Sequence, residues 1–168
     1  MKTKHIIITI IGVFWLALQC TQAQTEYTAY QFENRANGQF LSLADDESGI
    51  TLTEKTNSNR LNQYFILKRL GDGKVLIASA QNFDIFLKND GTFSEISGAT
   101  DDYEWEINFS GNSGSPYCIL VAVNKASDPV LGTASSGETV QFYAQPTDVY
   151  NDSSERVCFN ITSRTKIF

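Results

Sequence analysis

The chain has 168 residues, with 19 acidic against 13 basic side chains and a formal net charge of −6. An acidic surface repels phosphate backbones and anionic lipid head groups. Nucleic acid and anionic membrane surfaces are therefore not expected as partners.

The first 23 residues have the pattern of a secretory signal peptide. Two lysines precede an apolar run, residues 6–18, and small residues follow at the positions that a signal peptidase reads. The run is shorter than the roughly 20 residues that a membrane-spanning helix needs. We therefore predict cleavage before Gln24, no membrane span, and a secreted or periplasmic protein. A lipid anchor on Cys20 is the alternative.

The remaining residues, 24–168, suffice for a single domain with a sizeable core and are too few for two ordinary domains. Cleavage would remove His5, the only histidine of the sequence. Without histidine a protein lacks the commonest general base, the usual partner of a nucleophilic serine or cysteine, and a favoured zinc ligand. Histidine-dependent catalysis is therefore excluded, and no cofactor or metal is expected.

Short runs of apolar and polar residues, separated by turn formers, predict twelve strands in three sets of four. The first set covers residues 30–33, 40–43, 49–53 and 65–67; the second covers 75–78, 84–87, 92–96 and 105–107; the third covers 117–123, 129–133, 139–143 and 157–161. Nowhere does a helical period persist for a dozen residues. We therefore predict an all-β domain.

A large aromatic residue recurs at the last strand of each set: Phe65, Trp105 and Phe159. A period of about 40 residues built from short strands indicates a repeat architecture. Three such units, at about residues 28–70, 71–111 and 112–168, predict a β-trefoil whose shared core holds the three aromatics. A β-sandwich is the alternative. The third unit is longer because of residues 144–155, which we predict to form an exposed loop.

The segment from Tyr30 to Leu43, followed by Asn62-Gln63-Tyr64-Phe65, resembles the opening repeat of ricin B-type lectin domains, which carry a Gln-x-Trp signature in each repeat. In that family an aspartate, an aromatic platform and an Asn-Gln pair hold a sugar. The carboxylate and amides bond vicinal hydroxyls, and the aromatic face covers the C–H side of the ring.

This resemblance implies a carbohydrate site in one of two places. In the first repeat Ser42 occupies the aspartate's position, and in the third Tyr143 provides a platform. The expected ligand-binding residues are Ser42, Asp45, Asn62 and Gln63 at the first place, and Tyr143, Asp148 and Asn151 at the second. Alternatively, the Asn-Gln pair caps a turn and Tyr143 is a packing aromatic.

These observations predict an exported, non-catalytic module that binds a glycan or polysaccharide. The alternative is a protein-binding trefoil that uses the loop at 144–155. A third class, a glycoside hydrolase using acidic pairs such as Asp45-Asp46 or Asp101-Asp102, requires carboxylates about 5 to 10 Å apart in a cleft.

Cys118 and Cys158 remain after cleavage, and an even pair in an exported chain is a candidate disulfide. If Ile119 and Val121 point inward, both cysteines face the opposite side of what would be neighbouring strands, where they could pair. Two buried thiols are the alternative.

Overall fold

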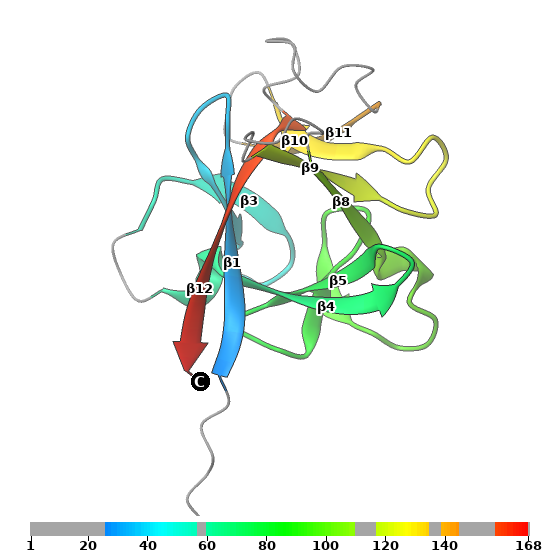
Figure 1. The fold of residues 1–168 in the computed structure, drawn as a ribbon, viewed down its shortest axis with the longest axis horizontal. Coiled ribbons are helices and arrows are strands. Elements are labelled where there is room, and N and C mark those ends of the chain that lie inside the picture. The colour runs from blue at the N-terminus through cyan, green and yellow to red at the C-terminus, as the bar shows by residue number, and fades with distance from the viewer. Residues whose placement is uncertain (1–25, 57–59, 110–116, 135–138, 145–156, 168) are drawn as a thin grey trace, which may run out of the picture.

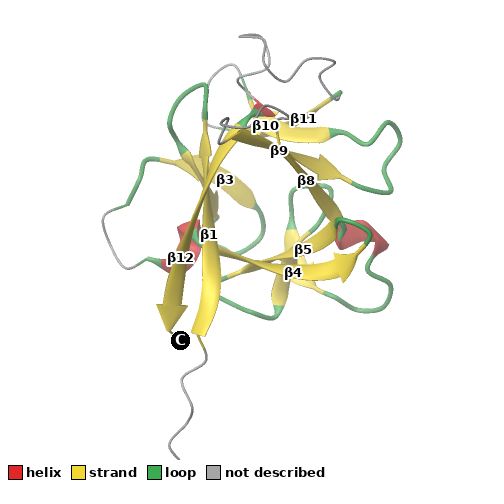
Figure 2. Ribbon diagram, viewed as in Figure 1, coloured by secondary structure: helices red, strands yellow, loops and turns green. Residues whose placement is uncertain are grey.

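A computed structural model of the chain describes residues 26–56, 60–109, 117–134, 139–144 and 157–167. Its strands are β1 (Glu26–Asn34), β2 (Phe40–Leu43), β3 (Ile50–Thr53), β4 (Phe65–Gly71), β5 (Lys74–Ser79), β6 (Ile85–Leu87), β7 (Phe93–Glu95), β8 (Trp105–Phe109), β9 (Tyr117–Ala122), β10 (Val130–Thr133), β11 (Val140–Tyr143) and β12 (Phe159–Ile167). Two short 3-10 helices, η1 (Leu61–Gln63) and η2 (Asp101–Tyr103), precede β4 and β8 (Figure 2).

The prediction of an all-β domain is confirmed, and each of the twelve predicted strands has a counterpart. The described residues contain no helix that is long and apolar enough to cross a membrane. The largest difference concerns β1 and β12, which extend well beyond their predicted ranges. These strands pair side by side over nine positions, from Glu26↔Ile167 to Asn34↔Phe159 (Figure 1). The extension is rich in polar residues, so hydrophobic patterning did not reveal it.

Six strands form a closed ring. Successive antiparallel pairs join β1 to β4, β4 to β5, β5 to β8, β8 to β9, β9 to β12, and β12 back to β1. The other six strands form three hairpins: β2–β3, β6–β7 and β10–β11. This is the predicted β-trefoil. The β-sandwich alternative is wrong because one sheet closes on itself instead of two sheets stacking.

The strand register repeats with threefold symmetry. Each of the three recurring aromatics sits opposite a residue of the neighbouring barrel strand: Phe65↔Ser79, Trp105↔Ala122 and Phe159↔Asn34. Two residues further along each strand, the pairs are Leu67↔Ile77, Ile107↔Leu120 and Ile161↔Phe32. Side chains two residues apart on a strand share a face. The three aromatics are fully buried in one cluster, as predicted.

A recurring backbone hydrogen bond fastens each repeat to the next. The residue before each aromatic accepts a bond from an N–H that follows the first strand of the next repeat, and the third repeat bonds back to the first. The three bonds are Ala80 N to Tyr64 O (2.9 Å), Val123 N to Glu104 O (3.0 Å) and Arg35 N to Cys158 O (2.9 Å). The carbonyl before each buried aromatic is therefore hydrogen-bonded, as buried backbone groups require.

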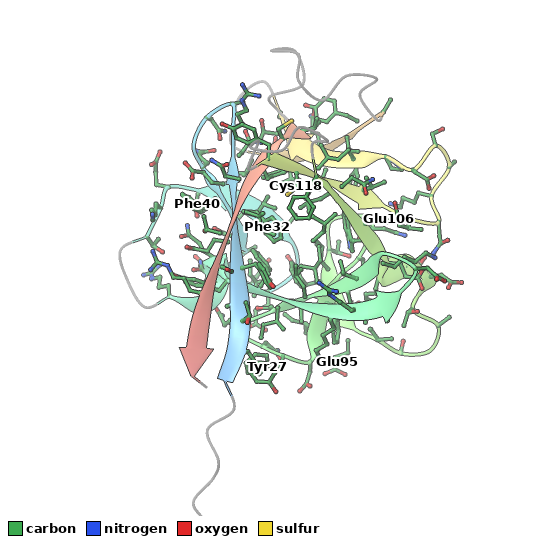
Figure 3. All side chains as sticks on the ribbon, in the orientation of Figure 1. Tyr27, Phe32, Phe40, Glu95, Glu106 and Cys118 are labelled. Atoms are coloured by element: carbon green, nitrogen blue, oxygen red, sulfur yellow. The ribbon has the colours of Figure 1, made fainter. Side chains whose placement is uncertain are left out.

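The prediction that Cys118 and Cys158 face the same side is wrong for Cys118, whereas Cys158 does lie on the side opposite Phe159. Cys118 belongs to the central core with Leu120, whereas Cys158 packs in a separate cluster with Ile119 and Val121. The outer face of β9 is also buried, partly against Val130 of β10, so apolar residues mark both faces of this strand. Figure 3 shows Cys118 in the middle of the molecule. The structure contains two buried thiols and no disulfide between them.

Burial raises the pKa of Cys118 to about 12, and the nearby Cys158 adds to that effect. Because the thiolate is the nucleophile, we expect iodoacetamide to leave Cys118 unmodified in the folded protein at about pH 8. Peptide mass spectrometry after timed labelling measures this. Complete labelling in denaturant is the control. Rapid modification of folded protein, or a mass showing a disulfide, would contradict the structure.

Replacing Trp105 by alanine removes a fully buried indole from the core and its Nε1 hydrogen bond to the Leu87 carbonyl oxygen (2.9 Å). We expect a loss of about 3–5 kcal/mol in unfolding free energy. Phe109→Ala is the matched control, since Phe109 lies on the same strand and is 61% exposed. Urea denaturation of both variants makes the comparison. Equal losses would show that Trp105 is not a core residue.

Candidate functional site

The residues predicted for the first-repeat site form a buried network. Ser42 and Gln63 are fully buried and meet at the Thr53 hydroxyl, which lies 2.5 Å from the Ser42 hydroxyl and accepts from Gln63 Nε2 at 2.8 Å. Gln63 Nε2 also donates to the Glu54 carbonyl, and its Oε1 accepts from the N–H and hydroxyl of Thr56. These polar atoms satisfy one another, as the turn-capping alternative expects.

The other two residues of that place differ in their surroundings. Asn62 is half-buried, and its Oδ1 is buried without a hydrogen-bond partner. Asp45 is exposed in the turn between β2 and β3. Asp45 therefore lies on the surface, whereas the hydrogen-bonded side chains of Ser42 and Gln63 are buried. A ligand-binding role for these four residues stays a prediction.

The third-repeat site is described only in part. Tyr143 is half-buried against the outer cluster of β9, and its hydroxyl donates to the Thr133 carbonyl oxygen at 2.6 Å. The same hydroxyl lies 3.1 Å from Gln141 Oε1. Asp148 and Asn151 lie outside the described residues, so their place beside Tyr143 stays a prediction.

A shallow depression of about 340 Å³ lies beside the hairpin of the second repeat. It is lined by residues of β4, of the turn before β6, and of the β6–β7 hairpin with the residue after it: Lys68, Phe83, Asp84, Phe86, Glu95 and Ile96. Phe86 occupies the position in β6 that Ser42 occupies in β2. Each lies one residue before the last pair of its hairpin, which is Leu87↔Phe93 in the second repeat and Leu43↔Ile50 in the first. The second repeat thus replaces a buried hydroxyl with an aromatic ring.

The depression combines apolar and acidic groups. Phe83 and Ile96 are partly buried and pack on the cluster that contains Phe86. Asp84 and Glu95 are exposed, and within the described part of the chain their carboxylates make no hydrogen bond or ion pair. Their oxygens are therefore available to an incoming donor.

Two further side chains shape the edge of the depression. The Lys68 ammonium lies 4.5 Å from the centre of the Phe86 ring, a cation–π contact. The Tyr27 ring lies 5.3 Å from that of Phe83 and is 38% exposed. Figure 3 shows Tyr27 and Glu95 at the same end of the molecule, below β4 and β5. Aromatic surface thus continues beyond the depression itself.

Sequence reasoning missed this site because it followed the amide pair. Asp102-Tyr103 replaces Asn-Gln here, and Tyr103 performs the tethering role of Gln63 with a different group. Its hydroxyl donates to the Glu95 carbonyl (2.9 Å) and lies 2.8 Å from the Ser94 hydroxyl. The available signal was the pair of phenylalanines on either side of Asp84-Ile85.

The acidic pairs considered for hydrolysis lie on the surface. Asp45, Asp46, Asp101 and Asp102 are all exposed. Hydrogen bonds from Ser48 hold the pKa of Asp46 below its usual value. A general acid needs the opposite shift, toward a raised pKa.

Glu104 is the buried carboxylate of the second repeat, and its oxygens accept hydrogen bonds from three side chains. It accepts from Lys74 Nζ at 2.7 Å, from the Thr100 hydroxyl at 3.0 Å and from Asn124 Nδ2 at 3.0 Å. The hydrogen bond from Lys74 is the main cause of a lowered pKa at Glu104. The group joins the second repeat to the third and is not free for catalysis.

No family model matches the sequence, and no curated protein sequence matches it significantly. Solved structures do match the fold. A designed threefold-symmetric protein, ThreeFoil, superposes with a TM-score of 0.60 at 18% identity, over 79% of this chain and 96% of that one.

Two natural proteins match as well. The endo-β-galactosidase from Clostridium perfringens that releases GlcNAcα1-4Gal has a TM-score of 0.66 at 15% identity, over 82% of this chain and 32% of the enzyme. The Polyporus squamosus lectin, bound to a sialylated epitope, has a TM-score of 0.58 at 11% identity, over 82% of this chain and 49% of the lectin. At these identities the likeness establishes the β-trefoil fold. The chain carries no complete Gln-x-Trp motif, since its three tripeptides are Gln63-Tyr64-Phe65, Tyr103-Glu104-Trp105 and Val157-Cys158-Phe159.

The Glu104 contact generates a prediction about acid stability. A carboxyl group with a lowered pKa stabilises the fold above its unfolded pKa and loses that contribution as pH falls through the folded pKa. We expect Glu104→Gln to be less stable than the parent protein at neutral pH, with the difference shrinking below about pH 4. Thermal unfolding over this pH range measures it. Glu106→Gln is the control, and a pH-independent difference would contradict the assignment.

Proposed function

We propose that this protein is a non-catalytic carbohydrate-binding module. The observation that carries the proposal is the second-repeat depression, where the partly buried ring of Phe83 lies beside two exposed carboxylates, Asp84 and Glu95. A sugar ring presents C–H groups on one face and hydroxyl donors at its edge, and such a surface offers a partner to each. The depression is shallow, which suits a chain-like or terminal sugar lying on the surface.

The comparisons support this proposal at the level of the scaffold. The Clostridium perfringens protein releases a disaccharide and the Polyporus squamosus protein is a lectin, and both contain a β-trefoil like this one. This chain spans about a third of the former and half of the latter. We extend glycan recognition to this chain because its own depression has suitable chemistry.

Absence of catalysis is part of the proposal. The only histidine of the sequence is His5. The buried carboxylate Glu104 is engaged by three donors, and Asp84 and Glu95 lie on an open surface that does not exclude water. A signal peptide at residues 1–23 would bring the module to glycans outside the cytoplasm. The protein-binding alternative depends on the loop at 144–155, most of which lies outside the described residues.

Affinity electrophoresis in gels containing neutral polysaccharides, followed by a glycan array, tests the proposal. We expect retardation of the parent protein and a loss of about tenfold in affinity for Phe83→Ala, because the ring supplies the apolar contact. Asp84→Asn and Glu95→Gln should weaken binding without destabilising the fold. Leu70→Ala is the matched control, since Leu70 is an exposed apolar residue outside the depression.

Two results would count against this assignment. Migration that no glycan retards would reject carbohydrate binding altogether. Binding that survives Phe83→Ala but is lost in Tyr143→Ala would move the site to the third repeat.

A further inference from the structure

The open end of the barrel contains a second cavity, distinct from the second-repeat depression. It has a volume of about 450 Å³ and is lined by residues of β1, β4, β5, β8, β12 and the β4–β5 turn. Its floor consists of half-buried apolar side chains that pack on the central core: Tyr30, Leu67, Ile107 and Ile161. A volume of this size is in the range that holds a small molecule.

The threefold register explains why the cavity is open. The inward rows of β4, β8 and β12 run Phe65-Leu67-Arg69, Trp105-Ile107-Phe109 and Phe159-Ile161-Ser163, with the third member of each row at the mouth. Two layers are apolar and filled. The third layer consists of Arg69, Phe109, whose ring is 61% exposed, and Ser163; Arg69 and Phe109 line the cavity.

Two glycines of the β4–β5 turn form part of the rim of the cavity. Gly71 and Gly73 both line the cavity and have positive φ angles of 120° and 80°. Apart from the adjacent residues, no heavy atom in the described part of the chain lies within 4 Å of where a Cβ would stand at either position, so the backbone conformation, and not crowding, favours glycine. The tight turn therefore adds no side chain to the mouth at positions 71 and 73.

Two basic residues lie at the mouth. Arg69 and Lys74 line the cavity, and among the described residues no aspartate or glutamate does. Lys74 is bonded to Glu104, whereas the Arg69 guanidinium has no ion pair among the described residues. Arg69 is exposed at the edge of the apolar floor, where its guanidinium can pair with an incoming anion.

We propose that the barrel mouth binds a small amphipathic anion, an acyl or aryl carboxylate. The apolar tail lies on Leu67, Ile107 and Ile161, and the carboxylate pairs with Arg69. The tail supplies affinity by leaving water, and the guanidinium fixes orientation through paired N–H donors. This site is separate from the proposed glycan surface and does not depend on it.

Isothermal titration calorimetry with decanoate, and with decanol as the uncharged analogue, tests the proposal. We expect decanoate to bind more tightly than decanol, and Arg69→Gln to weaken decanoate about tenfold while leaving decanol nearly unchanged. Arg164→Gln is the matched control, since Arg164 is an exposed arginine opposite Ala29 of β1, in a row that faces away from the mouth. Ile161→Phe should fill the cavity and abolish binding of both.

The outcomes separate clearly. Absence of decanoate binding, or equal losses in Arg69→Gln and Arg164→Gln, would overturn the proposal. So would sedimentation showing a dimer that Phe109→Ser dissociates, because the mouth would then be an interface between copies. If circular dichroism shows that Ile161→Phe is misfolded, the decanoate affinities of Arg69→Gln and Arg164→Gln decide whether the site exists. Decanoate binding unchanged in Phe83→Ala would show that the two sites are independent.

Discussion

Shared burial of Phe65, Trp105 and Phe159 is the constraint on which the structure depends. Each repeat presents an apolar inner face that it cannot cover alone, so the three faces cover one another. Stacked rings cross repeat boundaries, as where Trp105 lies 6.2 Å from Phe142 of the third repeat. The carbonyl before each aromatic then accepts an N–H from another repeat, which fixes the relative rotation of the units.

Because the core needs only the inward rows, the three hairpins can differ at their other positions. The same strand position holds a buried hydroxyl at Ser42, a ring at Phe86 and a glycine at Gly132. In the first repeat, Gln63 and Thr53 fill the space with their own hydrogen bonds. In the second, aromatic packing leaves a depression with open carboxylates, so one scaffold presents different chemistry in each repeat.

The sequence predicts strands well where only one face of the strand is buried, because apolar and polar residues then alternate. Alternation and turn formers predicted all twelve strands, and the spacing of large aromatics predicted the symmetry. It failed where both faces are buried. Ile119 and Val121 were as apolar as an inward row but face outward under the third hairpin, so Cys118 was assigned to the wrong side. The second-repeat depression was missed because the site prediction followed the Asn-Gln pair, which this repeat lacks, and because Phe83, Phe86 and Ile96 converge only on folding.

The pairing of β1 with β12 makes the first and last strands of the barrel neighbours. The β1–β12 pair that closes the barrel therefore joins the residues farthest apart in sequence, and its formation has the greatest loop-closure entropy to overcome. Until the last strand arrives, β1 and β9 each expose an unpaired edge that another molecule can extend. An incomplete barrel is thus an aggregation hazard until β12 pairs with both β1 and β9.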